Sequence, residues 1–432
     1  MIAASPRSVV CLWALLLFAV EHPVSLAAGP KAHLIHISVD GLAATYLPDF
    51  FTTAPENYPN FLRLIREGAS TLNARCDYDF SETMPNHTSM LLGRPVLQPA
   101  GWPDSAHHGF TDNFWSPEQT YHNSGNSNVS YLYSVFDVAH DHGLSTAFFA
   151  GKEKLAICYV SYNETNGAPD LMGEDNGQNK VDYAQILDWP MGYDCLALIN
   201  AVTNYLADHA PNYLFLHIAD LDYMGHYTGW GSEQWGSTLA DIDRCLGSLF
   251  EALARNSDFG IQTTIILTTD HGGGYPYNTH VYPFHPLNYT IPFMVWGPGW
   301  PANTDLYRLF ANRFDPGAGR PDYNAVQQPL RNGDSGNLAL AVLGLPPIPG
   351  SSLLPVRGLP QVALNISPTG QGVLVSWPSP STDFVLESTD NLGSTASWQV
   401  ISDGIIDDGT QLIYEWTDVL GGPTRFFRLR MN

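Results

Sequence analysis

Short apolar segments alternate with amphipathic segments through most of this chain. The apolar segments have the length and composition of strands and lie at His33–Val39, Leu144–Ala150, Tyr213–Asp220, Thr263–Thr269 and Ile291–Trp296. The amphipathic segments repeat apolar residues on one helical face and lie at Tyr58–Gly68, Cys195–His209 and Leu239–Leu253. Strands that alternate with helices in this way predict an α/β fold, with a mostly parallel central sheet and helices on both of its faces.

The sequence changes character after Leu359 and Pro360. Short alternating segments follow, separated by turn residues, at Gly372–Trp377, Asp383–Ser388, Leu412–Trp416 and Arg425–Leu429. This pattern predicts a small all-β module of the sandwich type. Because the module shows no cluster of titratable residues, we expect an accessory role for it, such as attachment.

The first residues have the pattern of a secretion signal. Arg7 precedes an apolar run from Val9 to Val20, which is too short to span a bilayer, and Ser25-Leu26-Ala27 offers small residues for cleavage. We therefore predict a signal peptide over residues 1–28, the α/β domain over 29–358 and the β-rich module over 359–432. The mature chain is expected to be secreted or periplasmic and to have no transmembrane segment.

Export would place the cysteines of the mature chain in an oxidising compartment. Cys11 leaves with the signal peptide, whereas Cys76, Cys158, Cys195 and Cys245 remain. Disulfides in any pairing and free buried thiols are both compatible with the sequence.

The chain is strongly acidic, with 19 Lys and Arg against 42 Asp and Glu and a formal net charge of −23. Such a charge disfavours the binding of nucleic-acid polymers or anionic membranes. Bound cations can reverse the sign of the potential locally, so a small phosphate ester remains compatible with it.

Acidic residues and histidines gather where the predicted strands end. Asp40, Asp222 and Asp270 lie at or just past carboxyl ends of strands, which is where open α/β sheets place their sites. The histidines that accompany these carboxylates are His226, His271 and His280. Carboxylate and imidazole ligands without thiolates suit zinc, with manganese as the alternative.

The sequence contains an ordered set of motifs, namely Asp40-Gly41, Thr83-Met84-Pro85-Asn86-His87, Asp222-Tyr223-Met224-Gly225-His226, Asp270-His271-Gly272 and a later histidine. This set resembles the motifs of the alkaline phosphatase superfamily, and most closely those of its type I phosphodiesterase/nucleotide pyrophosphatase branch. The resemblance covers roughly residues 31 to 350 and leaves the C-terminal module out. It implies an exported, metal-dependent hydrolase of small phosphate esters, most directly phosphodiesters or nucleotide pyrophosphates.

Matching of the motifs also implies roles for single residues. Two divalent metal ions would be held, one by Asp40, Thr83, Asp270 and His271 and the other by Asp222, His226 and His280. Thr83 would be the nucleophile, and Asn86, together with the Thr83 backbone N–H, would bind a phosphoryl oxygen. His285 lies in the same region as His280 and is the alternative for the last ligand.

The chemistry agrees with this set of residues. A turn around Pro85 and the stop at Gly93 place Thr83 at a predicted helix N-terminus, where backbone N–H groups favour an anion. A threonine hydroxyl is a poor nucleophile at neutral pH, but a divalent ion can activate it. A second ion can stabilise the leaving oxygen of an in-line displacement. The expected course is a phospho-threonine intermediate followed by its hydrolysis.

Three alternatives follow from the same residues. A sulfatase needs Cys or Ser as the nucleophile, with Pro two places on and Arg four places on, whereas this chain has Thr83, Pro85 and His87. Sulfate ester hydrolysis is therefore disfavoured. A phosphomonoesterase would use the same metal ligands. A metal-bearing exported binding protein without turnover is the alternative outside catalysis.

Overall fold

The computed structural model describes residues 32–172, 176–188, 194–260, 262–353, 356, 364–369, 372–379, 384–390, 397–408, 411–417 and 425–431. The predicted signal peptide lies outside these residues. Within them, no helix combines the length and the apolar character that a membrane crossing requires.

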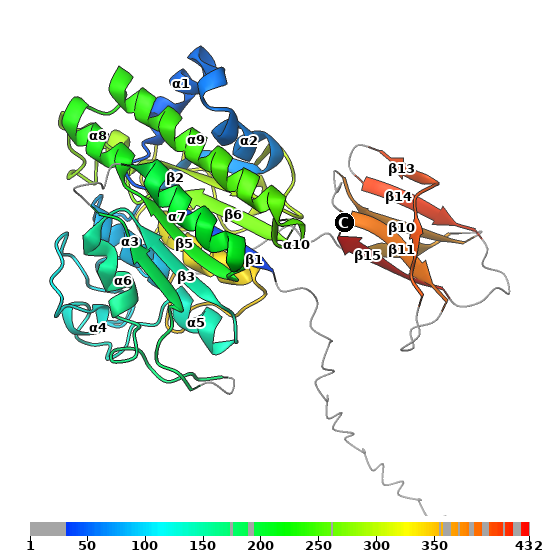
Figure 1. Ribbon diagram of the computed structural model, residues 1–432, viewed down its shortest axis with the longest axis horizontal. Coiled ribbons are helices and arrows are strands. Elements are labelled where there is room, and N and C mark those ends of the chain that lie inside the picture. The colour runs from blue at the N-terminus through cyan, green and yellow to red at the C-terminus, as the bar shows by residue number, and fades with distance from the viewer. Residues whose placement is uncertain are drawn as a thin grey trace, which may run out of the picture. The chain divides into compact units, whose positions relative to one another are not determined.

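An eight-stranded sheet forms the centre of the α/β domain (Figure 1). Its strands follow one another in the order β4-β3-β5-β1-β6-β7-β2-β8. They are β1 (His33–Val39), β2 (Ala69–Arg75), β3 (Thr146–Ala150), β4 (Tyr183–Ile186), β5 (Tyr213–Ile218), β6 (Thr263–Thr268), β7 (Thr290–Trp296) and β8 (Thr304–Asp305). Only β7 pairs antiparallel with its neighbours among these strands, so the predicted mostly parallel sheet is confirmed.

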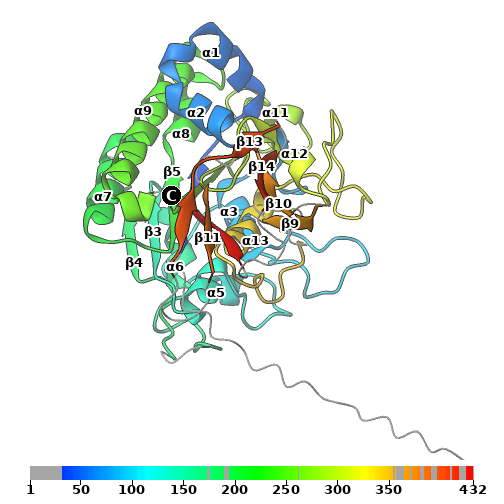
Figure 2. The same ribbon diagram turned by 90° about the vertical axis from the view of Figure 1, so that its right-hand side faces the viewer.

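Helices cover both faces of the sheet, as Figure 2 shows from a second side. The helices of the described residues are α1 (Leu47–Thr53), α2 (Pro59–Glu67), α3 (Thr83–Leu92), α4 (Tyr121–Ser124), α5 (Val135–Asp141), α6 (Ile157–Val160), α7 (Cys195–Asp208), α8 (Asp220–Thr228), α9 (Glu233–Arg255), α10 (Ser257–Gly260), α11 (Pro286–Tyr289), α12 (Leu306–Leu309) and α13 (Ser335–Val342). The core on one face is shared by α2, α7 and α9, and the core on the other face by α3, α5, α6 and α13.

The side chains of β1 show why both faces are apolar. Leu34 belongs to the core beneath α3, α5 and α13, whereas Ile35 and Ile37 belong to the core beneath α2, α7 and α9. Successive side chains of a strand point to opposite faces, so a strand that is covered on both faces reads as a nearly continuous apolar run.

The carboxyl ends of β1, β5 and β6 meet at one edge of the sheet because β1 pairs in parallel with both of the other strands. Ser38 of β1 lies opposite His217 of β5 and Thr268 of β6. The residues that follow these strands, among them Asp40 and Asp270, are thereby brought to the same place.

The C-terminal module consists of two antiparallel sheets in the described residues. Their orders are β13-β14-β10-β9 and β12-β11-β15, with strands β9 (Asn365–Pro368), β10 (Val373–Pro378), β11 (Phe384–Thr389), β12 (Gln399–Ile401), β13 (Ile405–Asp407), β14 (Gln411–Trp416) and β15 (Phe426–Met431). Val375 and Trp377 of the first sheet form a small core with Leu386 of the second. The predicted sandwich-like module is thus confirmed, but β9, β12 and β13 were missed because they are short and expose much of their surface.

Candidate active site

Thr83 is the first residue of α3 and is buried. His87, one turn further along the helix, donates from Nδ1 to the Thr83 carbonyl oxygen at 2.8 Å and accepts at Nε2 from Ser38 Oγ at 2.8 Å. This imidazole therefore ties the first turn of α3 to the end of β1. The helix ends at Gly93, whose φ of +62° is a backbone conformation that glycine adopts without strain.

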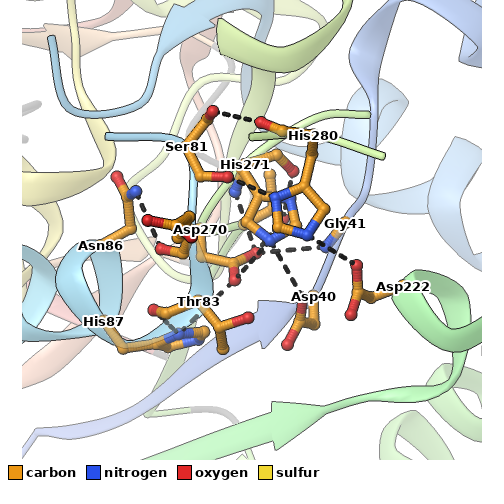
Figure 3. A network of polar contacts seen from close by, with 12 residues as sticks. Asp40, Gly41, Ser81, Thr83, Asn86, His87, Asp222, Asp270, His271 and His280 are labelled. Carbon is orange, nitrogen blue, oxygen red and sulfur yellow. Dashed lines mark hydrogen bonds and ion pairs between the residues drawn. The ribbon is translucent and has the colours of Figure 1, made fainter. Parts of the chain in front are cut away.

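Asp270 follows β6 and holds its carboxylate in one orientation. Its Oδ1 atom accepts hydrogen bonds from the backbone N–H of Gly41 at 3.1 Å, the N–H of His271 at 2.9 Å and the hydroxyl of Thr269 at 3.0 Å. Its Oδ2 atom is buried and has no hydrogen-bond partner in the described part of the chain. Three donors on one oxygen leave the other oxygen directed at the candidate metal site (Figure 3).

Asp40 and Asp222 are joined by a buried lysine. Lys152 Nζ lies 2.7 Å from Oδ2 of Asp40 and 2.7 Å from Oδ2 of Asp222. His217 donates from Nε2 to the same Asp40 oxygen at 3.0 Å. As with Asp270, each carboxylate commits one oxygen to the protein, and the Oδ1 atoms of both lack a hydrogen-bond partner among the described residues.

The three histidines of the predicted metal site share one arrangement. His226 donates from Nδ1 to the carbonyl of Asn278 at 2.8 Å, His271 to that of Gly272 at 2.7 Å, and His280 to that of Ser81. With the proton on Nδ1, the Nε2 atom carries the lone pair. Metal-binding imidazoles are commonly fixed in this way by a backbone carbonyl.

The free carboxylate oxygens and the Nε2 atoms face one another. Asp222 Oδ1 lies 3.4 Å from His226 Nε2 and 3.6 Å from His280 Nε2. His271 Nε2 lies 3.2 Å from Asp270 Oδ2 and 3.5 Å from Asp40 Oδ1. These atoms form two groups, one of Asp222 with His271 and His280 and one of Asp40 with Asp270 and His271, whose members lie within 4.8 Å of one another.

This donor set fits divalent metal ions. Four buried atoms without a hydrogen bond in the described residues point at one space, namely Asp40 Oδ1, Asp222 Oδ1, Asp270 Oδ2 and His271 Nε2. Buried polar atoms normally have hydrogen-bond partners, so a cluster of buried acceptors without such partners indicates a site that binds a cation. Carboxylate oxygens with imidazole nitrogens are zinc and manganese ligands.

Charge in the site also favours cations. Burial raises the pKa of Asp270 well above its usual range, and the Asp40 carboxylate adds to the effect. Burial alone would raise the pKa of Asp40 too, but the Lys152 ammonium and His217 hold it well below its usual range. One ammonium thus faces three buried carboxylates, and added positive charge would neutralise the remainder.

The structure places His280, and not His285, beside Asp222. The His285 ring stacks on Tyr275, with ring centroids 3.7 Å apart, and its Nδ1 atom accepts from the backbone N–H of Leu287 at the start of α11. His285 therefore serves a turn in the loop, whereas His280 stacks on His271 with ring centroids 3.6 Å apart.

Asn86 does not have the surroundings expected of a phosphoryl ligand. Its side-chain Nδ2 donates to the carbonyls of Phe80 at 3.0 Å and Glu82 at 3.1 Å, and its Oδ1 accepts from Asp77 N–H at 2.9 Å and Asn332 Nδ2 at 3.0 Å. Both donors of the amide are used within the protein, so the residue fixes the loop before α3. Neither donor is directed at the metal site in this structure, and a role of Asn86 in substrate binding stays a prediction.

Asn113 contacts the N-terminus of α3. Its Oδ1 accepts from the backbone N–H of Met84 at 3.2 Å, directly after Thr83, and from Lys154 Nζ at 2.9 Å. Burial lowers the pKa of Lys154 to about 8, and the nearby Lys152 charge contributes. Asn113 and Lys154 thus bring an amide and a second cation to the N-terminus of α3.

Sequence reasoning missed Lys152, Lys154, His217 and Asn113. A signal for the lysines was present, because Gly151-Lys152-Glu153-Lys154 directly follows a predicted strand at the carboxyl edge of the sheet. His217 sits within a predicted strand, and nothing in the pattern distinguishes it from a core residue. Asn113 lies in a loop rich in polar and aromatic residues, which has no periodic pattern that would predict which side chains point toward the site.

Two glycines permit the close approach of Trp230 to the site. A Cβ atom on Gly225, in α8, would lie 2.5 Å from the Trp230 ring, and one on Gly273 would lie 2.1 Å from it. Trp230 donates from Nε1 to the Gly41 carbonyl at 2.9 Å and meets the His226 ring edge-on. The indole thereby supports the loop that carries Asp40.

Residues 34–284 match the family model described as type I phosphodiesterase / nucleotide pyrophosphatase. No curated protein matches the chain significantly.

Several solved structures are similar to the chain. Murine ectonucleotide pyrophosphatase / phosphodiesterase 5 shares 13% identity with a TM-score of 0.46, covering 74% of this chain and 96% of that one. A protein in the alkaline phosphatase superfamily from Vibrio parahaemolyticus shares 13% identity with a TM-score of 0.46, covering 88% and 84%. A 2-O GAG sulfatase shares 10% identity with a TM-score of 0.48, covering 89% and 85%. These likenesses are too distant to carry an argument about the substrate.

Proposed function

The chain belongs to the type I phosphodiesterase/nucleotide pyrophosphatase family and is a phosphoric ester hydrolase, and on that premise we propose that it cleaves small phosphodiesters or nucleotide pyrophosphates with Thr83 as the nucleophile. The observation that carries this proposal is the group of four buried atoms without a hydrogen bond in the described residues, from Asp40, Asp222, Asp270 and His271. This group lies close to the first turns of α3, because His87 Nδ1 is 3.7 Å from Asp270 Oδ2.

The residues present fit two divalent metal ions, with zinc as the first choice and manganese as the second. Asp40, Thr83, Asp270 and His271 would hold one ion, and Asp222, His226 and His280 the other. Such ions would lower the pKa of the Thr83 hydroxyl and stabilise charge on the attacking and leaving oxygens.

Thr83 would attack phosphorus through Oγ1. The new Oγ1–P bond forms as the bond from phosphorus to the leaving oxygen breaks, and the leaving oxygen keeps the electron pair. Water then attacks the phospho-threonine, which releases the phosphate-bearing product and restores the hydroxyl. His87 supports both steps indirectly, because it fixes the carbonyl of Thr83 against β1.

The phosphoryl oxygens would be bound at the start of α3. The backbone N–H of Met84 points toward Asn113, and the N-terminus of a helix favours an anion. Lys154 adds a cation at the same place. We propose that Asn113 and Lys154, rather than Asn86, hold the non-bridging oxygens and stabilise the charge that develops in the transition state.

The experiment that tests this function compares matched substrates. Purified full-length protein, loaded with zinc, is given aryl phosphodiester, phosphomonoester and sulfate ester substrates that share one leaving group. We expect the diester to be hydrolysed fastest and Thr83→Ala to abolish turnover of it. Thr88→Ser, one turn further along α3 and buried, keeps a hydroxyl at an unrelated position and is the matched control.

Other outcomes identify the alternatives. A preference for the monoester or the sulfate ester would contradict the phosphodiesterase proposal and leave the family assignment intact. Metal bound without turnover of any ester would favour an exported binding protein.

We also propose export to the periplasm or the cell exterior and an attachment role for the C-terminal module. The leader pattern before residue 29 supports export. A separate small core, formed by Val375, Trp377 and Leu386, supports an independent module. Fractionation of cells that express the chain with and without residues 359–432 tests both proposals.

A further inference from the structure

Two of the four cysteines that remain in the predicted mature chain meet on the face of the sheet that carries α7 and α9. Cys195 is the first residue of α7, and Cys245 lies within α9. Their Sγ atoms are 2.9 Å apart, and both residues are buried, with 5% and 2% of their surfaces exposed. Fifty positions separate them along the chain, so the contact is made by the tertiary fold.

The other two cysteines are held apart from this pair. Cys76 contacts the carbonyls of Asp77 and Phe80, and Cys158 lies 3.2 Å from the hydroxyl of Tyr121. Both belong to the core on the opposite face of the sheet. Among the described residues, Cys195 and Cys245 are thus the only thiols in mutual contact.

We propose that Cys195 and Cys245 form a disulfide that ties the start of α7 to α9. Two thiols lose two protons and two electrons as the Sγ–Sγ bond forms, and the disulfide of a thiol–disulfide oxidoreductase, or of oxidised glutathione, is reduced to two thiols. The sequence left the pairing open, and the structure selects this one.

The bond has a structural purpose near the active site. The backbone N–H of Cys195 donates to Asp220 Oδ1 at 2.8 Å, and Asp220 is the first residue of α8. The same helix carries Asp222 and His226. Closing the loop from Cys195 to Cys245 therefore constrains the segment that contains α8 and limits its freedom in the unfolded chain.

The surroundings of the pair decide when the bond can form. Contact with Cys245 and burial raise the pKa of the Cys195 thiol, and the Asp220 carboxylate adds to the effect. Attack on a disulfide needs a thiolate, so the folded protein exchanges slowly at this pair. We expect the bond to form late in folding, when α7 and α9 have come together but the two thiols are not yet fully buried.

Peptide mapping after refolding tests the proposal. The mature chain, which starts after the predicted signal peptide and lacks Cys11, is refolded from denaturant in a mixture of reduced and oxidised glutathione, quenched with acid, alkylated in denaturant and digested without reduction. We expect one linked peptide that contains Cys195 and Cys245, with Cys76 and Cys158 alkylated. Four alkylated cysteines, or a different linked pair, would overturn the proposal.

Matched variants and a stability measurement complete the test. Cys245→Ala should remove the linked peptide, whereas Cys158→Ala should keep it. If a variant fails to fold, the oxidised and reduced wild-type protein still give the comparison, and oxidation should raise the melting temperature by about 5 °C. An unchanged melting temperature would contradict the structural role. None of these readouts depends on hydrolysis, so a failure of the proposed function would be distinguishable.

Discussion

Lys152 Nζ lies 2.7 Å from the Oδ2 atom of Asp40 inside the protein, and it makes the same contact with Asp222. The two carboxylates belong to the two different predicted metal-ligand sets. A single buried ammonium therefore orients one carboxylate in each ligand set. Its positive charge also neutralises part of the negative charge that bound metal ions would otherwise have to neutralise alone.

Replacement of Lys152 should destabilise the metal-free protein more than the metal-loaded protein. In Lys152→Met the carboxylates of Asp40 and Asp222 lose their buried partner, which typically costs about 3 to 5 kcal/mol of unfolding free energy. Bound zinc would offset most of this loss. Denaturant unfolding in chelator and in excess zinc measures both values.

Arg313→Met is the matched control for this prediction. Arg313 is buried and paired with Asp334 at 2.6 Å, and neither residue belongs to a group that could hold a metal ion among the described residues. Its loss should cost the same with and without zinc. An equal cost for Lys152→Met under both conditions would contradict its role beside the metal ions.

Removal of a single predicted ligand should change the metal content. His280→Ala takes away an Nε2 atom beside Asp222, so we expect elemental analysis to find about one zinc ion per chain instead of two. His285→Ala is the control and should keep the wild-type content, because its ring contacts Tyr275. The opposite result would identify His285 as the ligand.

Replacement of Asn113 should mainly affect catalysis, whereas replacement of Asn86 should mainly affect stability. Asn113→Ala should lower kcat/KM by about 100-fold or more, as expected for the loss of one donor to the transition state, and should lower the melting temperature less than Asn86→Ala does, because Asn113 is only partly buried. Asn86→Ala should lower stability by about 1 to 3 kcal/mol, because it leaves buried partners such as Asn332 unpaired. Steady-state kinetics and thermal unfolding of both variants would show the reverse pattern if Asn86 bound the substrate.

Substrate binding should weaken at alkaline pH. Burial lowers the pKa of Lys154 to about 8, so this lysine is charged below that pH and becomes neutral above it. The KM for an anionic diester should therefore rise as the pH increases from 7 to 10. Lys154→Arg, which stays charged over this range, should remove the rise. A KM profile that is identical in both proteins would exclude Lys154 from substrate binding.

Local sequence patterns were sufficient to predict many of the strands and helices of the α/β domain. The predicted strand His33–Val39 has the bounds of β1, and the predicted helix at Cys195–His209 differs from α7 by one residue. These elements depend on apolar periodicity and on end signals that lie within the element. By contrast, the antiparallel direction of β7 depends on the path of the loop between β6 and β7. The spacing of apolar residues within a strand carries no information on that path.

The order of residues along the chain is enough to show that acidic residues and histidines follow strands, and parallel pairing brings such residues to one edge of a sheet. Which of these residues have an atom without a hydrogen bond depends on the fold of the whole domain. Asn86 and Asn332 are separated by 246 positions, and Lys152 and Asp40 by 112. Partners so distant are chosen by packing of the whole domain, because a side chain's role depends on which of its donors and acceptors the fold has already used.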